Sequence, residues 1–467
     1  MQVITISREY VKPSNPFLHH LKPYKLCLFD QLTPLTYPPG IIFYPNAKLG
    51  HYIDQNHNFN NNNYNGNDND NILQETLAQL KKSLSEALNL HYPFAGRIKN
   101  NLYVDDFDAG LLYVEARVNC RMSEYFKLRD TESLDHFLPF PPFRKEAAET
   151  SSLPQVAFQV NIFACGGIAL GISLSHKFCD GATVMYLLKT WAAEFTNSPE
   201  KVVLPNLAGA SSAFPPRDLP QSHLDLMDEM WFKETNYVTK RFVFDAKAIA
   251  TLRAKAKSDR VPKPSRNEAL TGFIWKHATA ASWAVSGSPK LSVAAHAVNM
   301  RPRVKKPYSL ENSTGNLFWW AFAAANPANE TERELHQLVG LLKEVLEGFD
   351  NDFLESMHGQ EGFAMISELL SQIEAMFSME SEKPDIFAFT GWNGLFNDID
   401  FGWGKPFWVG VMGKVGPVFR NLVVFIDAQW GKGIEAWITL EEKQMKVLES
   451  DKEFLAFAAL NPGISSL

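Results

Sequence analysis

One histidine and one aspartate stand four residues apart in the segment IALGISLSHKFCDG, residues 168–181. A neutral imidazole can accept a proton from an alcohol or a thiol near pH 7, so a histidine fixed beside a substrate can act as a general base. His176 is therefore a candidate catalytic residue, and Asp180 could orient its ring as in a catalytic triad. Because such spacing is a weak signal alone, the surrounding elements must support the interpretation.

The residues around this motif predict a strand, a turn and a helix. Residues 155–175 predict a hairpin that turns at Cys165-Gly166-Gly167, and its second strand alternates apolar with small residues. Large apolar residues recur at helical spacing after Gly181. His176 and Asp180 would then lie in a strand-to-helix turn, where a rigid scaffold can aim side chains into a cavity.

Length and composition indicate a globular enzyme of two domains. The chain has 467 residues, which is more than one core usually supports, and 45% hydrophobic with 21% charged residues is an ordinary globular composition. A net charge of -7 argues against nucleic acid or an anionic membrane as the main partner. Without a signal-peptide pattern, a membrane span or a CxxC pair, we expect a cytoplasmic monomer with no metal site and no disulfide framework.

Composition also suggests where the chain divides. Residues 197–223 are aperiodic and rich in Pro, Ser and Ala, so we predict a crossover linker there, between an N-terminal domain (1–196) and a C-terminal domain (224–467). The Asn-rich residues 55–71 predict a mobile surface loop. The last three predicted strands are spaced like an antiparallel meander: FWVGVMG (407–413), NLVVFIDAQ (421–429) and GIEAWITL (433–440).

A second motif, DFGWGKP (400–406), follows FTGWN (389–393). Two glycines around a tryptophan bend the backbone sharply, which alone predicts only a packed aromatic loop. Together with HKFCDG, the motif resembles the signature of the plant BAHD acyl-CoA-dependent acyltransferases, HxxxDG and DFGWG. Other segments are similar to landmarks of that family in the same order: YPFAGR (92–97), FACGG (163–167), NMRPR (299–303), NSTGN (312–316) and GIEAWITL (433–440). One departure is Cys27, where members often have serine.

The resemblance implies an α/β fold like that of chloramphenicol acetyltransferase, in which two similar mixed-sheet domains with flanking helices enclose a through-going tunnel. Acyl-CoA, a co-substrate and not a tightly bound cofactor, would enter from one side and the acceptor alcohol from the other. His176 would deprotonate the acceptor hydroxyl, which would attack the thioester directly, with no acyl-enzyme. The indole N–H of Trp392 and the hydroxyl of Thr390 would stabilise the oxyanion; losing one such donor typically costs about 3 kcal/mol.

The resemblance gives structural roles to other residues of the catalytic turn. It pairs Asp180, which precedes Gly181, with Arg301, so we expect the carboxylate to point away from the tunnel into a buried or semi-buried ion pair. Cys179 is interpreted as structural, because a neighbouring carboxylate raises the pKa of a thiol. Lys177 is expected to be solvated or to lie between the domains.

In the second motif, Asp400 is kept as a candidate catalytic residue, but Gly402 and Gly404 favour the interpretation that it shapes the loop over direct proton transfer.

CoA carries phosphates, so its binding requires a local group of cations. Residues 258–269, SDRVPKPSRNEA, supply Arg260, Lys263, Ser265 and Arg266 just before a predicted helix, whose N-terminus also favours anions. The alternative is an ordinary solvated basic loop. The resemblance favours CoA binding at this segment.

The sequence therefore predicts an O-acyltransferase that moves an acyl group, in particular acetyl, from CoA to a hydroxyl of a plant specialised metabolite. The acetyl preference and an alkaloid or terpenoid acceptor come from resemblance to that branch of the family. Three alternatives stay open: an amine acceptor that gives an N-acyl product, a non-catalytic member that binds a metabolite or a protein, and a condensation domain of a peptide-assembly enzyme, which shares HxxxDG but not DFGWG.

Overall fold

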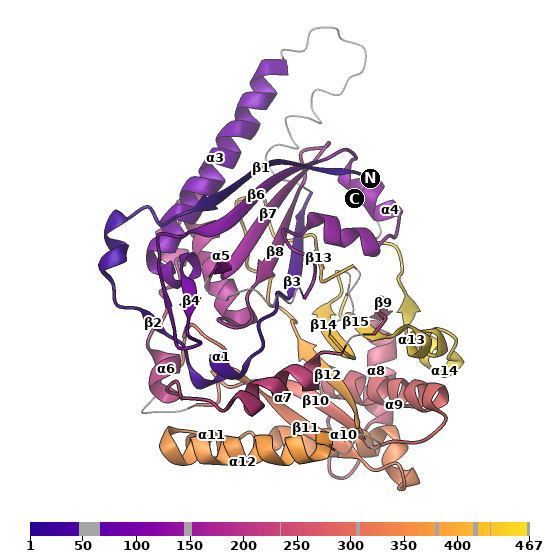
Figure 1. The fold of residues 1–467 in the computed structure, drawn as a ribbon. Helices are drawn as coiled ribbons and strands as arrows, with labels where there is room; N and C mark the ends of the chain where they lie inside the picture. The colour runs from indigo at the N-terminus through magenta and orange to yellow at the C-terminus, as the bar shows by residue number, and fades with distance from the viewer. Residues whose placement is uncertain are drawn as a thin grey trace.

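Two mixed β-sheets form the framework of the protein (Figure 1). The computed structural model describes residues 1–45, 66–143, 152–233, 235–304, 309–378, 383–413, 419–429 and 431–464. The first sheet has six strands in the order β1 (Val3–Val11), β6 (Leu111–Val118), β7 (Val156–Phe163), β8 (Ile168–Leu174), β3 (Pro39–Tyr44) and β13 (Trp408–Gly410). The predicted α/β fold with two sheet-rich domains is confirmed.

The second sheet has seven strands. Their order is β11 (Phe318–Ala325), β10 (Ser292–Asn299), β12 (Asp385–Gly391), β14 (Leu422–Asp427), β15 (Ile434–Glu441), β9 (Tyr237–Phe244) and β16 (Ala459–Leu460). A small third sheet has the order β2 (Tyr24–Lys25), β5 (Tyr103–Asp105) and β4 (Arg97–Lys99). The predicted hairpin over 155–175 is confirmed, because β7 and β8 pair antiparallel.

Helices pack against both large sheets (Figure 1). Those up to residue 231 are α1 (Leu28–Leu32), α3 (Gly66–Leu90), α4 (Met122–Lys127), α5 (Gly181–Phe195), α6 (Gly209–Ala213) and α7 (Gln221–Trp231), with short 3-10 segments η1 (Pro16–His20), η2 (Tyr92–Ala95), η3 (Glu132–Phe137) and η5 (Pro199–Lys201). Those that follow are α8 (Ala246–Lys255), α9 (Arg266–Ser286), η6 (Glu330–Arg333), α10 (Leu335–Glu347), α11 (Asn351–Ser356), α12 (Gly359–Ser378), α13 (Glu442–Leu448) and α14 (Lys452–Leu455). In the described part of the chain, no helix is long and apolar enough to span a bilayer.

Helix α3 begins earlier than the sequence predicts. Residues 66–71 of the predicted loop 55–71 form its first turns, whereas residues 55–65 lie outside the described residues. Helix growth is cooperative, so a helix formed by the residues that follow can extend its backbone over this stretch despite the poor helix propensity of Asn and Gly. The loop prediction is therefore wrong for residues 66–71.

The predicted C-terminal meander is only partly present. β14 and β15 pair antiparallel as expected, but β13 leaves that sheet and pairs with β3 in the first one, with Trp408 opposite Phe43. Trp408 is buried against the rings of Phe43 and Phe126. Because Phe43 lies on β3 of the first sheet and Phe126 on α4, burying Trp408 against these rings outweighs continuing the meander. The proposed division at residues 197–223 stays a prediction; that stretch holds η5, α6 and the start of α7.

The second sheet opens at one point. Parallel pairing of β10 with β12 runs from Ser292 opposite Asp385 to His296 opposite Phe389. Beyond these residues β10 continues to Asn299 beside β11, while β12 continues to Gly391 beside β14. The two strands therefore separate at their carboxyl ends, and residues at both ends line a cavity.

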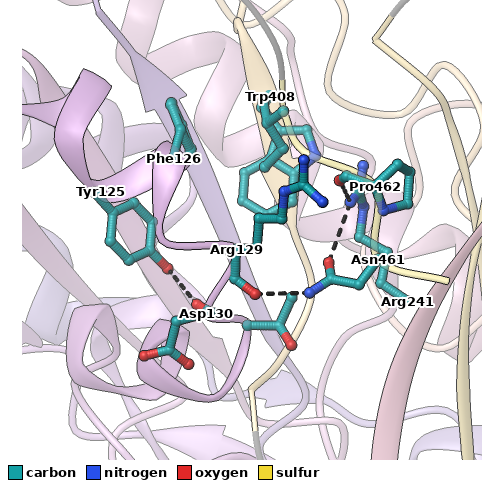
Figure 2. A pocket seen from close by; sticks show the side chains of 10 residues that line it. Tyr125, Phe126, Arg129, Asp130, Arg241, Trp408, Asn461 and Pro462 are labelled. Atoms are coloured by element: carbon teal, nitrogen blue, oxygen red, sulfur yellow. Dashed lines mark hydrogen bonds between the residues drawn. The ribbon is translucent and has the colours of Figure 1, made fainter.

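Figure 2 shows the C-terminal segment bound between the two halves of the molecule. Asn461 donates from Nδ2 to the carbonyl oxygen of Arg129, at 2.7 Å, and its backbone N–H donates to the carbonyl oxygen of Arg241, at 2.8 Å. Arg241 in turn donates to the carbonyl oxygen of Pro462 at 2.8 Å, and its guanidinium lies 5.6 Å from the centre of the Trp408 ring. The chain end thus ties the segment after α4 in the first half to β9 of the second.

A buried ion pair lies beside this contact. Arg241 and Glu435 are 2.7 Å apart, with side chains 5% and 3% exposed. Trp408 also donates to both carboxylate oxygens of Glu435, at 3.3 Å each. The carboxylate therefore joins β9, β15 and the crossing strand β13.

We predict that Glu435→Gln lowers the free energy of unfolding by about 3 to 5 kcal/mol, because it leaves the buried Arg241 without a counter-charge. Glu347→Gln is the matched control, since it removes an exposed partner of Lys343 and should cost less than about 1 kcal/mol. Urea unfolding of both variants measures the difference. Equal losses would contradict the importance of the buried pair.

Candidate active site

The catalytic turn lies between β8 and α5 and is fixed by its backbone. The amide of Ser175 donates to the carbonyl oxygen of Gln155 at 2.7 Å, and that of His176 donates to the carbonyl oxygen of Thr36 at 2.9 Å. Asp180 then caps α5 by accepting a hydrogen bond from the amide of Thr183 at 2.9 Å. The strand, the turn and the helix therefore occur in the predicted order.

The Asp180 carboxylate faces Arg301, and the expected ion pair is present. Its oxygens lie 2.6 and 3.1 Å from the guanidinium nitrogens, and the two side chains are 9% and 7% exposed. Burial raises the pKa of Asp180, but the Arg301 charge and its hydrogen bonds more than offset this, so the pKa lies below its usual value. Arg301 also donates to the carbonyl oxygens of Ser313 and Gly315. The pair thus holds the catalytic turn to the segment before β11.

The ring of His176 is oriented by Asn316, a residue to which sequence reasoning assigned no role beyond its place in NSTGN. Nδ1 of His176 lies 3.1 Å from Oδ1 of Asn316, and the ring centroid is 5.4 Å from that of Phe318. Burial lowers the pKa of His176, an effect that Asp180 and Asn316 only partly oppose. The imidazole is therefore neutral near pH 7 and available as a base.

A cavity of about 230 Å³ lies beside His176. Six predicted residues line it: His176, Asp180, Gly181, Arg301, Thr390 and Trp392. Thr390 and Gly391 are the last residues of β12, at the point where the second sheet opens. The backbone N–H of Trp392 donates to the carbonyl oxygen of Phe425 at 2.7 Å, so contact with β14 continues one residue past the end of β12. The structure therefore brings the candidate base and the two candidate oxyanion donors around one cavity.

The second motif lies elsewhere. Asp400 is exposed, and its Oδ1 accepts hydrogen bonds from the amides of Gly402 and Gly404, at 2.7 and 2.9 Å. Both glycines have positive φ, +79° and +89°, which other residues rarely adopt. Asp400 is not among the described residues that line the cavity. This geometry supports loop shaping and argues against proton transfer by Asp400.

The loop packs on the helix that follows the catalytic turn. The ring of Phe401 is 5.1 Å from Trp191, and that of Trp403 is 5.5 Å from Phe195. Both partners belong to α5. The DFGWG motif therefore packs on α5, the helix that Asp180 of the first motif caps.

The residues proposed to bind CoA contact two different parts of the protein. Arg260 is exposed and pairs with Glu344 at 2.9 Å, and Lys263 is exposed. Ser265 is the N-cap of α9 and accepts from the amide of Glu268 at 3.1 Å. The structure thus confirms that a helix begins directly after the segment, whereas CoA binding there stays a prediction.

The start of α9 is connected to the opening in the second sheet. Arg266 pairs with Asp427 at 3.2 Å, and Asp427 also accepts from Nδ2 of Asn393 at 3.2 Å. Asn267 donates to Oδ1 of Asn393 at 2.9 Å. Since Asn393 follows Trp392, this network joins the basic segment to the cavity wall.

Two neighbours of His176 are buried. Cys179 lies in the core, where burial and then the Asp180 charge raise its pKa well above the usual value. Lys177 is 8% exposed and donates to the carbonyl oxygens of Gln31 and Thr33, at 2.6 and 2.9 Å. Burial lowers the pKa of Lys177 to about 8. The solvated alternative for Lys177 is therefore wrong, because two carbonyl groups replace its water.

Comparison with known proteins gives consistent matches over the whole chain. A family model described as Transferase family matches residues 1–455. Limonoid 7-O-acetyltransferase of Citrus sinensis is 40% identical, with 99% of this chain and 99% of the relative covered. Akuammiline synthase 2 of Alstonia scholaris is 38% identical, with 99% and 98% covered. The crystal structure of vinorine synthase has a TM-score of 0.75 and 31% identity, with 98% of each chain covered.

We predict that Asp180→Ala lowers the free energy of unfolding by about 3 to 5 kcal/mol, because Arg301 is left as an uncompensated buried charge. Replacing Arg301 as well should cost less than the sum of the two single losses, since contacting residues are non-additive. A double-mutant cycle measured by urea unfolding checks this. Additive losses, or an Asp180→Ala protein that is inactive but as stable as wild type, would assign Asp180 to the chemistry instead.

Proposed function

The chain belongs to the Transferase family, the BAHD acyl-CoA-dependent acyltransferases, and from this premise we propose that it transfers the acetyl group of acetyl-CoA to a hydroxyl of an alkaloid or terpenoid. The observation that carries the proposal is that His176, Thr390 and Trp392 surround one cavity. The relatives support the acyl group and the acceptor class, because several are named as O-acetyltransferases of limonoids or alkaloids.

In the proposed mechanism, Nε2 of His176 accepts the proton of the acceptor hydroxyl while the oxygen attacks the thioester carbonyl. The carbonyl oxygen becomes an oxyanion, which the Trp392 indole N–H and the Thr390 hydroxyl stabilise. Collapse of the intermediate breaks the C–S bond, and His176 returns the proton to the CoA thiolate. No acyl-enzyme forms, which agrees with the burial and raised pKa of Cys179.

Acyl-CoA approaches from the α9 side of the second sheet. The proposed approach is at the point where β10 and β12 separate, and a side chain at Gly391 would crowd it, since a Cβ there would lie 3.0 Å from Nδ2 of Asn267. Lys263, Ser265 and Arg266 hold the phosphates at the helix start. Arg260 joins them by exchanging Glu344 for a phosphate, which an exposed ion pair permits.

The acceptor half of the cavity is aromatic. Trp320 lies 4.4 Å from Trp231 and 5.6 Å from Phe318, and Trp231 stacks on Phe419 at 6.0 Å. We name these four side chains the aromatic wall. Such flat surfaces suit a rigid polycyclic acceptor.

The charges of the cavity favour an acceptor whose reacting group is uncharged. Of the described residues that line it, the acidic and basic ones other than His176 are Asp180 and Arg301, which neutralise each other. An ammonium group placed beside His176 as the reacting group would therefore find no free carboxylate among those residues. This favours O-acylation over the N-acylation alternative.

The enzyme acts as a cytoplasmic monomer in this proposal. Support for the compartment comes from its four cysteines, all of which are free, as expected in a reducing environment. A non-catalytic protein would not need a neutral, oriented histidine at the cavity, and this argues against that alternative. A condensation domain is disfavoured by the family match over residues 1–455.

We predict that His176→Ala lowers the rate of acetyl transfer by about 10² to 10⁴-fold without changing CoA affinity, because the base acts on the transition state. Release of free CoA thiol, measured with acetyl-CoA and a panel of hydroxylated alkaloids, limonoids and phenolics, gives the rate. His136→Ala, at an exposed histidine, is the control and should leave the rate unchanged. A His176→Ala enzyme with near wild-type turnover would refute the mechanism.

We also predict that Trp320→Ala raises KM for a polycyclic acceptor by about tenfold, which corresponds to about 1.4 kcal/mol, because a stacking surface is lost. KM for acetyl-CoA should not change. Trp283→Ala, which removes a tryptophan of α9 that contacts Arg333, is the matched control. Equal effects of both substitutions on acceptor KM would place the acceptor away from the aromatic wall.

A further inference from the structure

Asn316 lies at the centre of a hydrogen-bond network built from three distant segments. Its backbone N–H and its Nδ2 both donate to Oδ1 of Asp30, at 2.7 and 3.0 Å. Nδ2 donates in addition to the carbonyl oxygen of His176, at 2.7 Å. Asp30 belongs to α1, and Asn316 precedes β11, so neither segment is near the catalytic turn in sequence.

These contacts settle which way the Asn316 amide points. A carboxylate and a carbonyl oxygen can only accept hydrogen bonds, so the amide must present its two hydrogens to Asp30 and to the backbone of His176. Oδ1 of Asn316 is then the atom that faces Nδ1 of His176, at 3.1 Å. Because an amide oxygen only accepts, Nδ1 carries the proton and Nε2 is left unprotonated.

Asp30 is well placed to enforce this orientation. It is fully buried, and its second oxygen accepts from the amide of Cys27 at 2.8 Å, so the carboxylate cannot turn away. Burial raises the pKa of Asp30 to about 6, an effect that the hydrogen bonds from Cys27 and Asn316 oppose, and the group is ionised at neutral pH. If the Asn316 amide were flipped, its oxygen would face both the carboxylate and a carbonyl oxygen with no donor between them.

We infer that Asp30 is a positioning residue, whose carboxylate holds Asn316 in the orientation that keeps the proton of His176 on Nδ1 and leaves Nε2 free to act as the base. The inference rests on the proposed function, in which Nε2 of His176 takes the acceptor proton. It extends the site to a residue that is connected to the His176 ring only through Asn316. Asp30 acts through that amide and does not contact the substrate.

The charged surroundings of Asp30 are consistent with this role. Lys177, next to His176, is a buried cation that favours the ionised carboxylate. Tyr24, Cys27 and Cys179 also face it, and burial raises the pKa of each well above its usual value, so they are uncharged near pH 7. The Asp30 carboxylate is therefore the negatively charged group to which the Asn316 amide donates.

The first test reads the tautomer directly in the wild-type protein. ¹⁵N chemical shifts of histidine-labelled enzyme distinguish Nδ1–H from Nε2–H, and the His176 signals are identified by their loss in His176→Ala. We expect Nδ1–H in wild type and a mixture of tautomers in Asp30→Asn, whose amide can present either an oxygen or an NH₂ group to Asn316. A wild-type Nε2–H tautomer, or an unchanged Nδ1–H tautomer in Asp30→Asn, would overturn the inference.

The second test is a double-mutant cycle with Asn316. Asp30→Asn should lower kcat by about tenfold or more with little change in KM for acetyl-CoA. In an Asn316→Ala background, where no amide is left for Asp30 to hold, Asp30→Asn should lower kcat little further, because contacting residues that act as one unit are non-additive. A full additional loss of kcat in that background would show that Asp30 acts by another route and would contradict the inference.

A control variant distinguishes the proposed role of Asp30 from a general effect of helix capping. Asp245→Asn alters another helix-capping aspartate, which accepts from the amide of Ala248 at 2.7 Å, and should leave kcat and the His176 tautomer unchanged. Loss of kcat in that variant comparable to Asp30→Asn would indicate a general effect of capping and contradict the inference. If wild type releases no thiol with any acceptor, the proposed function fails, while the tautomer measurement still decides the role of Asp30.

Discussion

The ion pair between Asp180 and Arg301 is the interaction on which the site depends. It joins the helix cap of α5 to the segment that leads into β11, so it fixes the catalytic turn against the second sheet. Its two charges are satisfied by each other and by backbone groups, and they leave no net charge at the cavity wall. This geometry supports a structural role for the acidic member of HxxxDG and argues against proton transfer by it.

With the turn fixed in this way, each sheet contributes one part of the proposed chemistry. The first sheet presents His176 at the end of β8, and the second presents Thr390 and Trp392 where β10 and β12 separate. In the proposed function, acyl-CoA approaches from the α9 side and the acceptor lies against the aromatic wall. Under that proposal, neither substrate has to leave before the other binds.

The sequence predicts the short-range parts of this arrangement well. The alternation before His176 and the helical spacing after Gly181 are local patterns, and β8 and α5 follow them. Asn316 and Asp30 were missed, because their roles arise from contacts with partners 140 and 286 positions away. The position of β13 was also mispredicted, because regular spacing shows that a strand exists but does not tell which sheet it joins.

The crossing of β13 has a consequence for how the chain is made. Its partner β3 spans Pro39–Tyr44, but β13 spans Trp408–Gly410, so the ribosome completes the first sheet only when most of the protein has been synthesised. Until then β3 is an open edge with unpaired backbone groups and apolar side chains, which is prone to wrong pairing. We therefore expect a fragment that ends before Trp408 to aggregate more readily than the full chain, because the edge of β3 that β13 covers stays unpaired in it.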